Sequence, residues 1–247
     1  MAQVQKTGDR LAGKVALVTG GSTGIGRGIA TRFAGEGASV VICARGKERL
    51  EKAAEEIAKA TGSRVEAMPC DLTDEAQVQA MFKRTMDRFG RLDILVNNAG
   101  GNSNDLIVDM PLAKWESVLG VNLNAVFLCG REAMRIMKAQ KGGRIVNIGS
   151  IAAKVPRMRS CAYVAAKWGV SGLTRAMALE GREDGIAVSQ MNNGNTDTGH
   201  SSSAATEGAM EVDDVAGMVL AMVLLPPGVN VLEGTLTKVS MPYIGRG

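Results

Sequence analysis

Short apolar runs rich in β-branched residues alternate along this chain with longer stretches of helical composition. The runs with strand character are 15–20, 39–44, 64–71, 92–100, 143–150, 186–191 and 235–240. The helical stretches between them are 25–34, 47–60, 74–90, 112–138, 161–181 and 213–225. Thr73 is the expected N-cap of the third of these helices. Consecutive strands joined through helices pair in parallel, with the helices packed on the sheet. The pattern therefore predicts an α/β fold, a doubly wound sheet of about seven parallel strands with helices on both faces.

Composition shows no boundary along the 247 residues, so we predict a single domain over 1–247. The net charge of +4 is dispersed, which argues against nucleic acid as a partner. The longest apolar run, 215–225, spans half a bilayer, and the N-terminus lacks the apolar core of a signal peptide. Four scattered cysteines and one histidine, His200, make no metal site and favour free thiols. We expect a cytoplasmic protein with no membrane contact and no metal.

A glycine-rich turn, "TGGSTGIG", joins the first predicted strand to the first predicted helix. Gly20, Gly24 and Gly26 follow the spacing GxxxGxG and depart from GxGxxG. Glycines let the backbone approach a pyrophosphate closely, and the helix N-terminus offers free N–H groups. The turn therefore indicates a dinucleotide site, with a purely structural turn as the alternative.

The end of the second predicted strand indicates which dinucleotide is bound. An acid at that point would bind the 2′-hydroxyl of NAD. Ala44 stands there instead and Arg45 follows, and a guanidinium suits a 2′-phosphate. We predict NADP as the cofactor and regard NAD as second choice, unless Arg45 is only a solvated charge.

Tyr163 and Lys167 stand four residues apart in an alanine-rich predicted helix, so their side chains share one face. A free tyrosine titrates near ~10, and bringing it to neutral pH needs about 3 units, or roughly 4 kcal/mol. We expect the ammonium of Lys167, together with a positive nicotinamide ring in a partly desolvated cleft, to lower the pKa of Tyr163 so that the phenol exchanges a proton. The alternative is a packed tyrosine beside a solvated lysine.

Five motifs in order resemble the short-chain dehydrogenase/reductases: "TGGSTGIG" (19–26), "NNAG" (97–100), Asn122 in "GVNLNAVF", Ser150 in "IVNIGSIAA" and "YVAAK" (163–167). The resemblance covers nearly the whole chain. It implies a Rossmann-like domain, assembled as a homotetramer or homodimer. It also implies an NADP(H)-dependent oxidoreductase (EC 1.1.1.-) that interconverts a ketone or aldehyde and an alcohol.

The resemblance assigns roles to particular residues. Ser150 bonds the substrate oxygen, Tyr163 is the general acid or base, Lys167 holds the nicotinamide ribose, and Asn122 positions a water. The cofactor-binding residues that we predict are Gly20, Ser22, Thr23, Gly24, Ile25, Gly26, Arg45, Asp71, Leu72, Asn98, Ala99, Gly100, Tyr163, Lys167, Gly194, Thr196 and Thr198. A 3-oxoacyl carrier-protein reductase is an alternative activity, and a non-catalytic NADP-binding regulatory or scaffold protein is an alternative of another class.

Two regions bear on the substrate. The polar segment 195–209 is predicted to be a mobile substrate loop, with a flexible connector as the alternative. Asn193 replaces a proline usual in the family, which we expect to loosen the turn before this segment. Lys154, Arg157 and Arg159 lie between Ser150 and Tyr163 and would attract an anionic substrate or an acyl carrier, unless they are only solvated. Neither feature selects one substrate.

Overall fold

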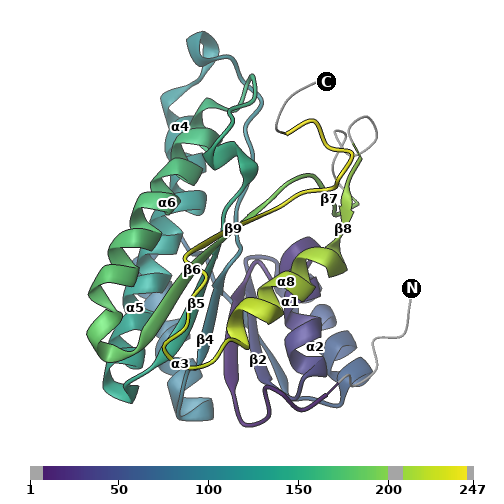
Figure 1. The fold of residues 1–247 in the computed structure, drawn as a ribbon, viewed down its shortest axis with the longest axis vertical. Coiled ribbons are helices and arrows are strands. Elements are labelled where there is room, and N and C mark those ends of the chain that lie inside the picture. Colours follow the sequence, from purple (N-terminus) through teal and green to yellow (C-terminus); the bar gives the residue numbers. More distant parts are fainter. Residues whose placement is uncertain (1–7, 200–207, 244–247) are drawn as a thin grey trace.

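The computed structural model describes residues 8–199 and 208–243, and a sheet of seven parallel strands forms its centre (Figure 1). The strands are β1 (Val15–Thr19), β2 (Ser39–Ala44), β3 (Val65–Pro69), β4 (Ile94–Asn97), β5 (Gly143–Ile148), β6 (Ile186–Asn193) and β9 (Glu233–Leu236). Their order across the sheet is β3-β2-β1-β4-β5-β6-β9. The chain moves outward from β1 to β3 and then returns to β4 on the other side of β1. The predicted α/β fold with seven parallel strands is confirmed.

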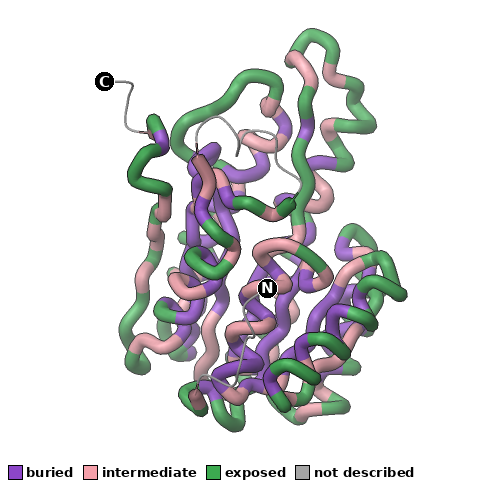
Figure 2. The backbone as a smooth tube through the Cα atoms, turned by 90° about the vertical axis from the view of Figure 1, so that its right-hand side faces the viewer, coloured by how far each residue is buried: buried purple, intermediate pink, exposed green. Residues whose placement is uncertain are grey.

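Helices cover both faces of this sheet (Figure 1). One face carries α1 (Gly24–Gly35), α2 (Lys47–Thr61) and α8 (Val212–Val223), and the other carries α3 (Glu75–Phe89), α4 (Leu112–Leu119), α5 (Ala125–Gln140) and α6 (Cys161–Glu180). Each face encloses its own hydrophobic cluster. All five residues of β1 are buried, as a parallel strand covered on both faces requires, and Figure 2 shows buried backbone running through the centre.

Three local features differ from the sequence prediction. The last strand is Glu233–Leu236, two to four residues earlier than predicted. The stretch predicted as one helix over 112–138 is helical throughout, but a π-helical turn, Gly120–Asn124, separates α4 from α5. A threonine, Thr73, would be the expected N-cap of α3, but Asp74 takes that position and accepts hydrogen bonds from the N–H groups of Ala76 and Gln77.

Short elements complete the description. They are the two-stranded pair β7 (Thr196–Asp197) and β8 (Met210–Glu211) and the 3₁₀ turns Ile107–Asp109, Ile151–Ala153 and Arg182–Asp184. Within 8–199 and 208–243, none of the helices combines the length and apolar character that crossing a membrane needs.

Candidate active site

The glycine-rich turn after β1 leaves the N-terminus of α1 open. Gly20 has φ of 66°, which favours glycine, and a Cβ on Gly26 would lie 2.4 Å from the carbonyl oxygen of Gly20. Thr23 is the N-cap residue of α1, and no side chain caps the helix there. The first N–H groups of α1 are therefore available to an external acceptor such as a phosphate.

A cavity of about 820 Å³ lies beside this turn, at the carboxyl ends of β1, β2 and β4. Nine of the predicted cofactor residues line it: Gly20, Ser22, Thr23, Arg45, Asp71, Leu72, Asn98, Ala99 and Gly100. This edge, where the strand order reverses, is where ligands bind in open α/β sheets.

Arg45 and Asp71 face this first cavity from the ends of β2 and β3. Arg45 is exposed, next to Ala44, and no carboxylate stands at the end of β2. Asp71 accepts hydrogen bonds from the backbone N–H and the hydroxyl of Thr73, which lower the pKa of its carboxyl, and the charge of Arg45 adds to this effect. Arg45 thus brings positive charge to the position that is expected to bind the 2′ substituent of the cofactor ribose.

A second cavity of about 400 Å³ adjoins the first, and both are lined by Asn98 and Gly100. All four predicted catalytic residues line it, together with five further predicted cofactor residues: Asn122, Ser150, Tyr163 and Lys167, with Ile25, Asn98, Gly100, Gly194 and Thr198. Three predicted cofactor residues, Gly24, Gly26 and Thr196, line neither cavity. Gly26 instead packs against Gly20, and the hydroxyl of Thr196 donates to the carbonyl of Gly194.

Lys167 is a buried ammonium at the floor of this second cavity. Its side chain is 4% exposed, and its Nζ donates to the carbonyl oxygen of Ile148 at 2.8 Å. Burial lowers the pKa of Lys167 from 10.5 to about 8. With this pKa Lys167 is still mostly an ammonium at pH 7, and it loses its proton as the pH rises through about 8.

The phenol of Tyr163 is buried beside Ser150 and Lys167. Burial raises the pKa of the phenol, and hydrogen bonding with Ser150 offsets only part of the increase. Lys167 Nζ lies 5.5 Å from the centre of the Tyr163 ring. Desolvation of the buried phenol therefore opposes the lowering of its pKa that the sequence predicts from nearby positive charge.

Asn122 lies inside the π-helical turn that interrupts the α4–α5 helix. Its side chain is buried; Nδ2 donates to the carbonyls of Gly101 at 2.8 Å and Val118 at 2.9 Å. A Cβ on Gly100 would lie 2.6 Å from Asn122 Oδ1. The π turn thus brings Asn122 against the loop that follows β4, as such turns often do at functional sites.

Ser150 lies two residues after the end of β5, beyond Gly149, and is the N-cap residue of the 3₁₀ turn Ile151–Ala153. Its Oγ accepts a hydrogen bond from the N–H of Ala152 at 3.1 Å, and its own N–H donates to Asn192 Oδ1 at 3.1 Å. The hydroxyl is thus held at the strand end where Tyr163 also reaches the cavity.

The amide of Asn98 has a structural task as well. Its Nδ2 donates to the carbonyl of Thr19 at 2.9 Å, and the Thr19 hydroxyl accepts from the N–H groups of Asn98 and Ala99. Asn97, one residue earlier, donates to Asn147 on β5 at 2.9 Å. The "NNAG" motif therefore joins β4 to its two neighbours in addition to lining the cavities.

Asn193 does not leave the following turn without support. Its Nδ2 donates to the carbonyl of Gly194 at 3.1 Å and to the hydroxyl of Thr196 at 3.3 Å. Side-chain hydrogen bonds thus replace part of the rigidity that proline would supply. The predicted mobile loop 195–209 and His200 fall mostly outside the described residues, which stop at 199 and resume at 208.

The three basic residues before Tyr163 have different environments. Arg157 lines the second cavity. Lys154 is paired with Glu233 at 2.7 Å and does not line the second cavity. Arg159 is exposed and lines a separate surface hollow with Ile107 and Val164. Only Arg157 is placed as the anionic-substrate hypothesis requires.

Sequence reasoning missed several residues of the site. Asn102 lines both cavities, and Asn192 and Glu233 form contacts behind Ser150. A signal for Asn192 was present, because "SQMNN" places polar residues within and directly after the predicted strand 186–191. Among the residues described, no three His, Cys, Asp or Glu side chains gather as a metal site would need.

Comparison with known proteins identifies the family. The family model of the short chain dehydrogenases matches residues 14–208. The chain belongs to this family. It is therefore an oxidoreductase, and the family uses a nicotinamide cofactor.

Individual relatives agree with this assignment. The chain is 44% identical over 185 residues to the uncharacterized oxidoreductase YxjF of Bacillus subtilis, covering 75% of this chain and 72% of that one. It is 42% identical over 176 residues to the 3-oxoacyl-[acyl-carrier-protein] reductase FabG of Staphylococcus aureus, covering 71% of each. The chain spans 64% to 72% of the length of such relatives. A metagenomic short-chain oxidoreductase solved in complex with NADP superposes with a TM-score of 0.83 at 34% identity, covering 92% of this chain and 98% of that one.

Proposed function

We propose that this short-chain dehydrogenase interconverts a ketone or aldehyde and an alcohol, with NADP(H) as its cofactor. The observation that carries the proposal is that Asn122, Ser150, Tyr163 and Lys167 line one cavity that adjoins the glycine-rich turn. A non-catalytic NADP-binding protein would have no need of this convergence. We propose that residues 1–247 act as one NAD(P)-binding domain.

The site fits a nicotinamide dinucleotide. The uncapped N-terminus of α1 and the close approach of Gly20 and Gly26 suit a pyrophosphate. The contiguous cavities run from Arg45 to Lys167, so one extended molecule reaches from one end to the other. When bound, the cofactor supplies or accepts the hydride.

The protein's own groups handle the proton and the substrate oxygen. Ser150 donates a hydrogen bond to that oxygen, and Tyr163 gives it a proton during reduction or removes one during oxidation. The ammonium of Lys167 would bind the cofactor ribose and stabilise the phenolate form of Tyr163 during the proton transfer. Asn122 holds the loop after β4 and so shapes the wall beside these groups. The raised pKa of Tyr163 keeps the phenol protonated, which is the form needed for reduction.

The direct test is NADPH oxidation followed at 340 nm with a panel of ketones, aldehydes and 3-oxoacyl thioesters, repeated with NADH. We expect turnover with at least one carbonyl class and preference for NADPH. No turnover by folded protein that binds NADPH would contradict the proposed activity.

Preference for NADP over NAD is tested at Arg45. Its exposed guanidinium lines the first cavity beside Ala44. We expect Arg45→Ala to weaken NADPH binding at least about tenfold and NADH binding less than about twofold, because charge-assisted bonds to phosphate contribute about 1.5–3 kcal/mol. Equal losses for both cofactors would reject the 2′-phosphate assignment.

A 3-oxoacyl carrier-protein reductase is the second candidate. The 42% identity to the reductase of Staphylococcus aureus favours it, and so does Arg157 at the second cavity. An acyl carrier protein is acidic and needs a basic docking surface. Faster reduction of a 3-oxoacyl carrier protein than of the matching simple thioester would support this activity, and equal rates would speak against it.

We propose a homotetramer or homodimer in the cytoplasm. Phe127 on α5 and Trp168 and Leu179 on α6 are exposed, at 46%, 53% and 63%. Such apolar surface on two neighbouring helices suits an interface between copies of the chain. The four unpaired cysteines suit a reducing compartment. Light scattering on the purified protein would give the oligomeric state.

A further inference from the structure

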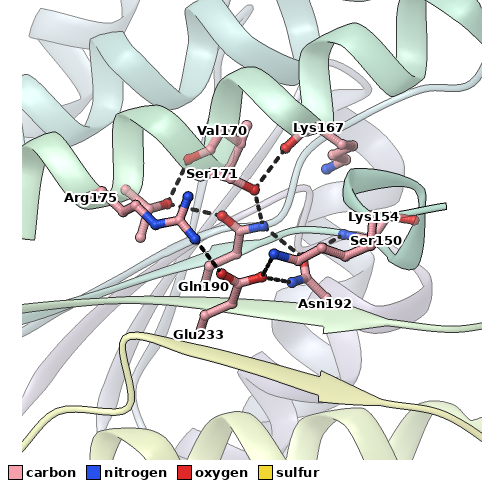
Figure 3. A network of polar contacts seen from close by, with 10 residues as sticks. Ser150, Lys154, Lys167, Val170, Ser171, Arg175, Gln190, Asn192 and Glu233 are labelled. Atoms are coloured by element: carbon pink, nitrogen blue, oxygen red, sulfur yellow. Dashed lines mark hydrogen bonds and ion pairs between the residues drawn. The ribbon is translucent and has the colours of Figure 1, made fainter. Parts of the chain in front are cut away.

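Polar side chains lie behind Ser150, on β6 and on the edge strand β9 (Figure 3). Gln190 and Asn192 alternate along β6, so they share one face of the strand, and they are 1% and 0% exposed. Buried amides are costly unless each polar atom is paired. Their presence in β6, which is paired on both sides, therefore needs an explanation.

Asn192 connects three parts of the molecule. Its Oδ1 accepts hydrogen bonds from the backbone N–H of Ser150 at 3.1 Å and from Gln190 Nε2 at 2.7 Å. Its Nδ2 donates to Glu233 Oε1 at 2.9 Å. Since the donor and the acceptor ends have different partners, the amide has one orientation. In that orientation, the acceptor faces the N–H of Ser150.

Glu233 is itself fixed by two cations. Lys154 Nζ lies 2.7 Å from one carboxylate oxygen and Arg175 lies 2.9 Å from the other, and these contacts lower the pKa of the carboxyl (Figure 3). Ion pairs as exposed as these contribute little stability. Their effect is geometric: Lys154 follows the turn that Ser150 begins, so the segment 150–154 is held at both ends.

Gly149 shows how closely Asn192 approaches the active-site strand. A Cβ on Gly149 would lie 2.1 Å from Asn192 Oδ1 and 2.7 Å from Gln190 Nε2. The N–H of Gly149 donates to the carbonyl of Met191 at 2.8 Å. Two consecutive N–H groups, those of 149 and 150, are thus held by β6, and only glycine leaves room for the Asn192 amide.

The same network reaches the helix that carries Lys167. Gln190 Nε2 also donates to Ser171 Oγ at 2.9 Å, and Ser171 Oγ donates to the carbonyl oxygen of Lys167 at 3.3 Å (Figure 3). Gln190 thus ties β6 to α6 at the level of the site.

We propose that Asn192, oriented by Glu233, is a positioning residue that fixes the backbone of Ser150 and so aims its hydroxyl at the substrate oxygen. The proposal rests on the proposed function, because it assigns Asn192 an effect on turnover through Ser150. It also makes the edge strand β9 part of the active-site framework.

Two variants and one control test this role. Asn192→Ala removes the acceptor, and Glu233→Ala removes the group that orients it while changing only a partly exposed side chain. Glu66→Ala is the matched control, because Glu66 lies on the other edge strand, β3, and also pairs with two cations, Arg64 and Arg88. Hydrogen exchange of a peptide covering 149–155 is measured in each folded protein. We expect exchange about tenfold faster in both test variants and unchanged in the control.

Kinetics then separate positioning from folding. With the carbonyl compound that the screen identifies, we expect kcat to fall about tenfold in Asn192→Ala and about fivefold in Glu233→Ala, because small displacements of a catalytic group are costly. We expect Glu233→Gln to recover most of the activity, since its amide oxygen still accepts from Asn192. The Kd for NADPH should stay within about twofold throughout.

A double variant decides whether the effect passes through Ser150. In a Ser150→Ala background, measured by single-turnover NADPH oxidation, Asn192→Ala should cost less than about twofold. The same loss with and without the Ser150 hydroxyl would overturn the proposal. Unchanged hydrogen exchange over 149–155 in both test variants would also overturn the proposal. This exchange measurement needs no substrate, so it holds even if the wild-type protein reduces no compound in the panel. That separate result would contradict the proposed function.

Discussion

Replacement of Lys167 by methionine is expected to stabilise the protein while abolishing its activity. Lys167 is 4% exposed, and burial lowers its pKa from 10.5 to about 8. Each pKa unit corresponds to about 1.36 kcal/mol, so the buried ammonium costs about 3 kcal/mol of folding stability at pH 7. Loss of its hydrogen bond to the carbonyl of Ile148 offsets about 1 kcal/mol. We expect Lys167→Met to raise the free energy of unfolding by about 2 kcal/mol at pH 7.

The sign of the pH dependence follows from the lowered pKa. Between pH 8 and 10.5 the unfolded chain binds more protons at Lys167 than the folded chain, so this residue makes the wild type more stable as the pH rises. The advantage of the variant should therefore shrink by about 2 kcal/mol between pH 7 and pH 9.5. Titrations common to both proteins cancel in this difference.

Urea unfolding followed by circular dichroism, at one protein concentration and at both pH values, measures these free energies. A variant that is less stable than the wild type at pH 7 would refute the calculation. A difference in stability that is the same at both pH values would refute it as well.

Two further substitutions have defined outcomes. Gly149→Ala would place a methyl group 2.1 Å from Asn192 Oδ1. We expect the purified variant to lose at least about 2 kcal/mol of stability and to have a lower kcat. Wild-type stability and kcat in this variant would show that the backbone at Gly149 is not confined. Asp74→Ala removes the N-cap of α3, and we expect a loss of about 1 kcal/mol in urea unfolding with unchanged turnover, whereas no change in stability would contradict the capping role.

The sheet and its helices could be predicted from the sequence because the apolar runs and the helical stretches alternate clearly. The π turn at Asn122 could not, since its residues continue a helical pattern and only the close contact with Gly100 and Gly101 reveals its purpose. Thr73 and Asp74 are both good N-cap residues, and the choice between them depends on Asp71, which takes the hydroxyl and N–H of Thr73.

The positions of the site residues were predicted best where the sequence assigned the residue to a strand end or to one face of a predicted helix. Ser150, Tyr163 and Lys167 reach one cavity, as their places at a strand end and on one helix face predict. The burial that raises the pKa of Tyr163 could not be predicted, because it depends on neighbours that a local motif does not contain. The role of Asn192 depends on Glu233, forty-one residues later in the chain, and such a pairing has no local signal.

The central claim is that the Tyr163 hydroxyl exchanges the proton while a carbonyl is reduced in the second cavity. The most direct measurement is single-turnover oxidation of bound NADPH at 340 nm, with the carbonyl compound that the screen identifies, in wild type and Tyr163→Phe. We expect the rate to fall at least about a thousandfold while the Kd for NADPH stays within about twofold. A rate in Tyr163→Phe within about tenfold of wild type would contradict the account.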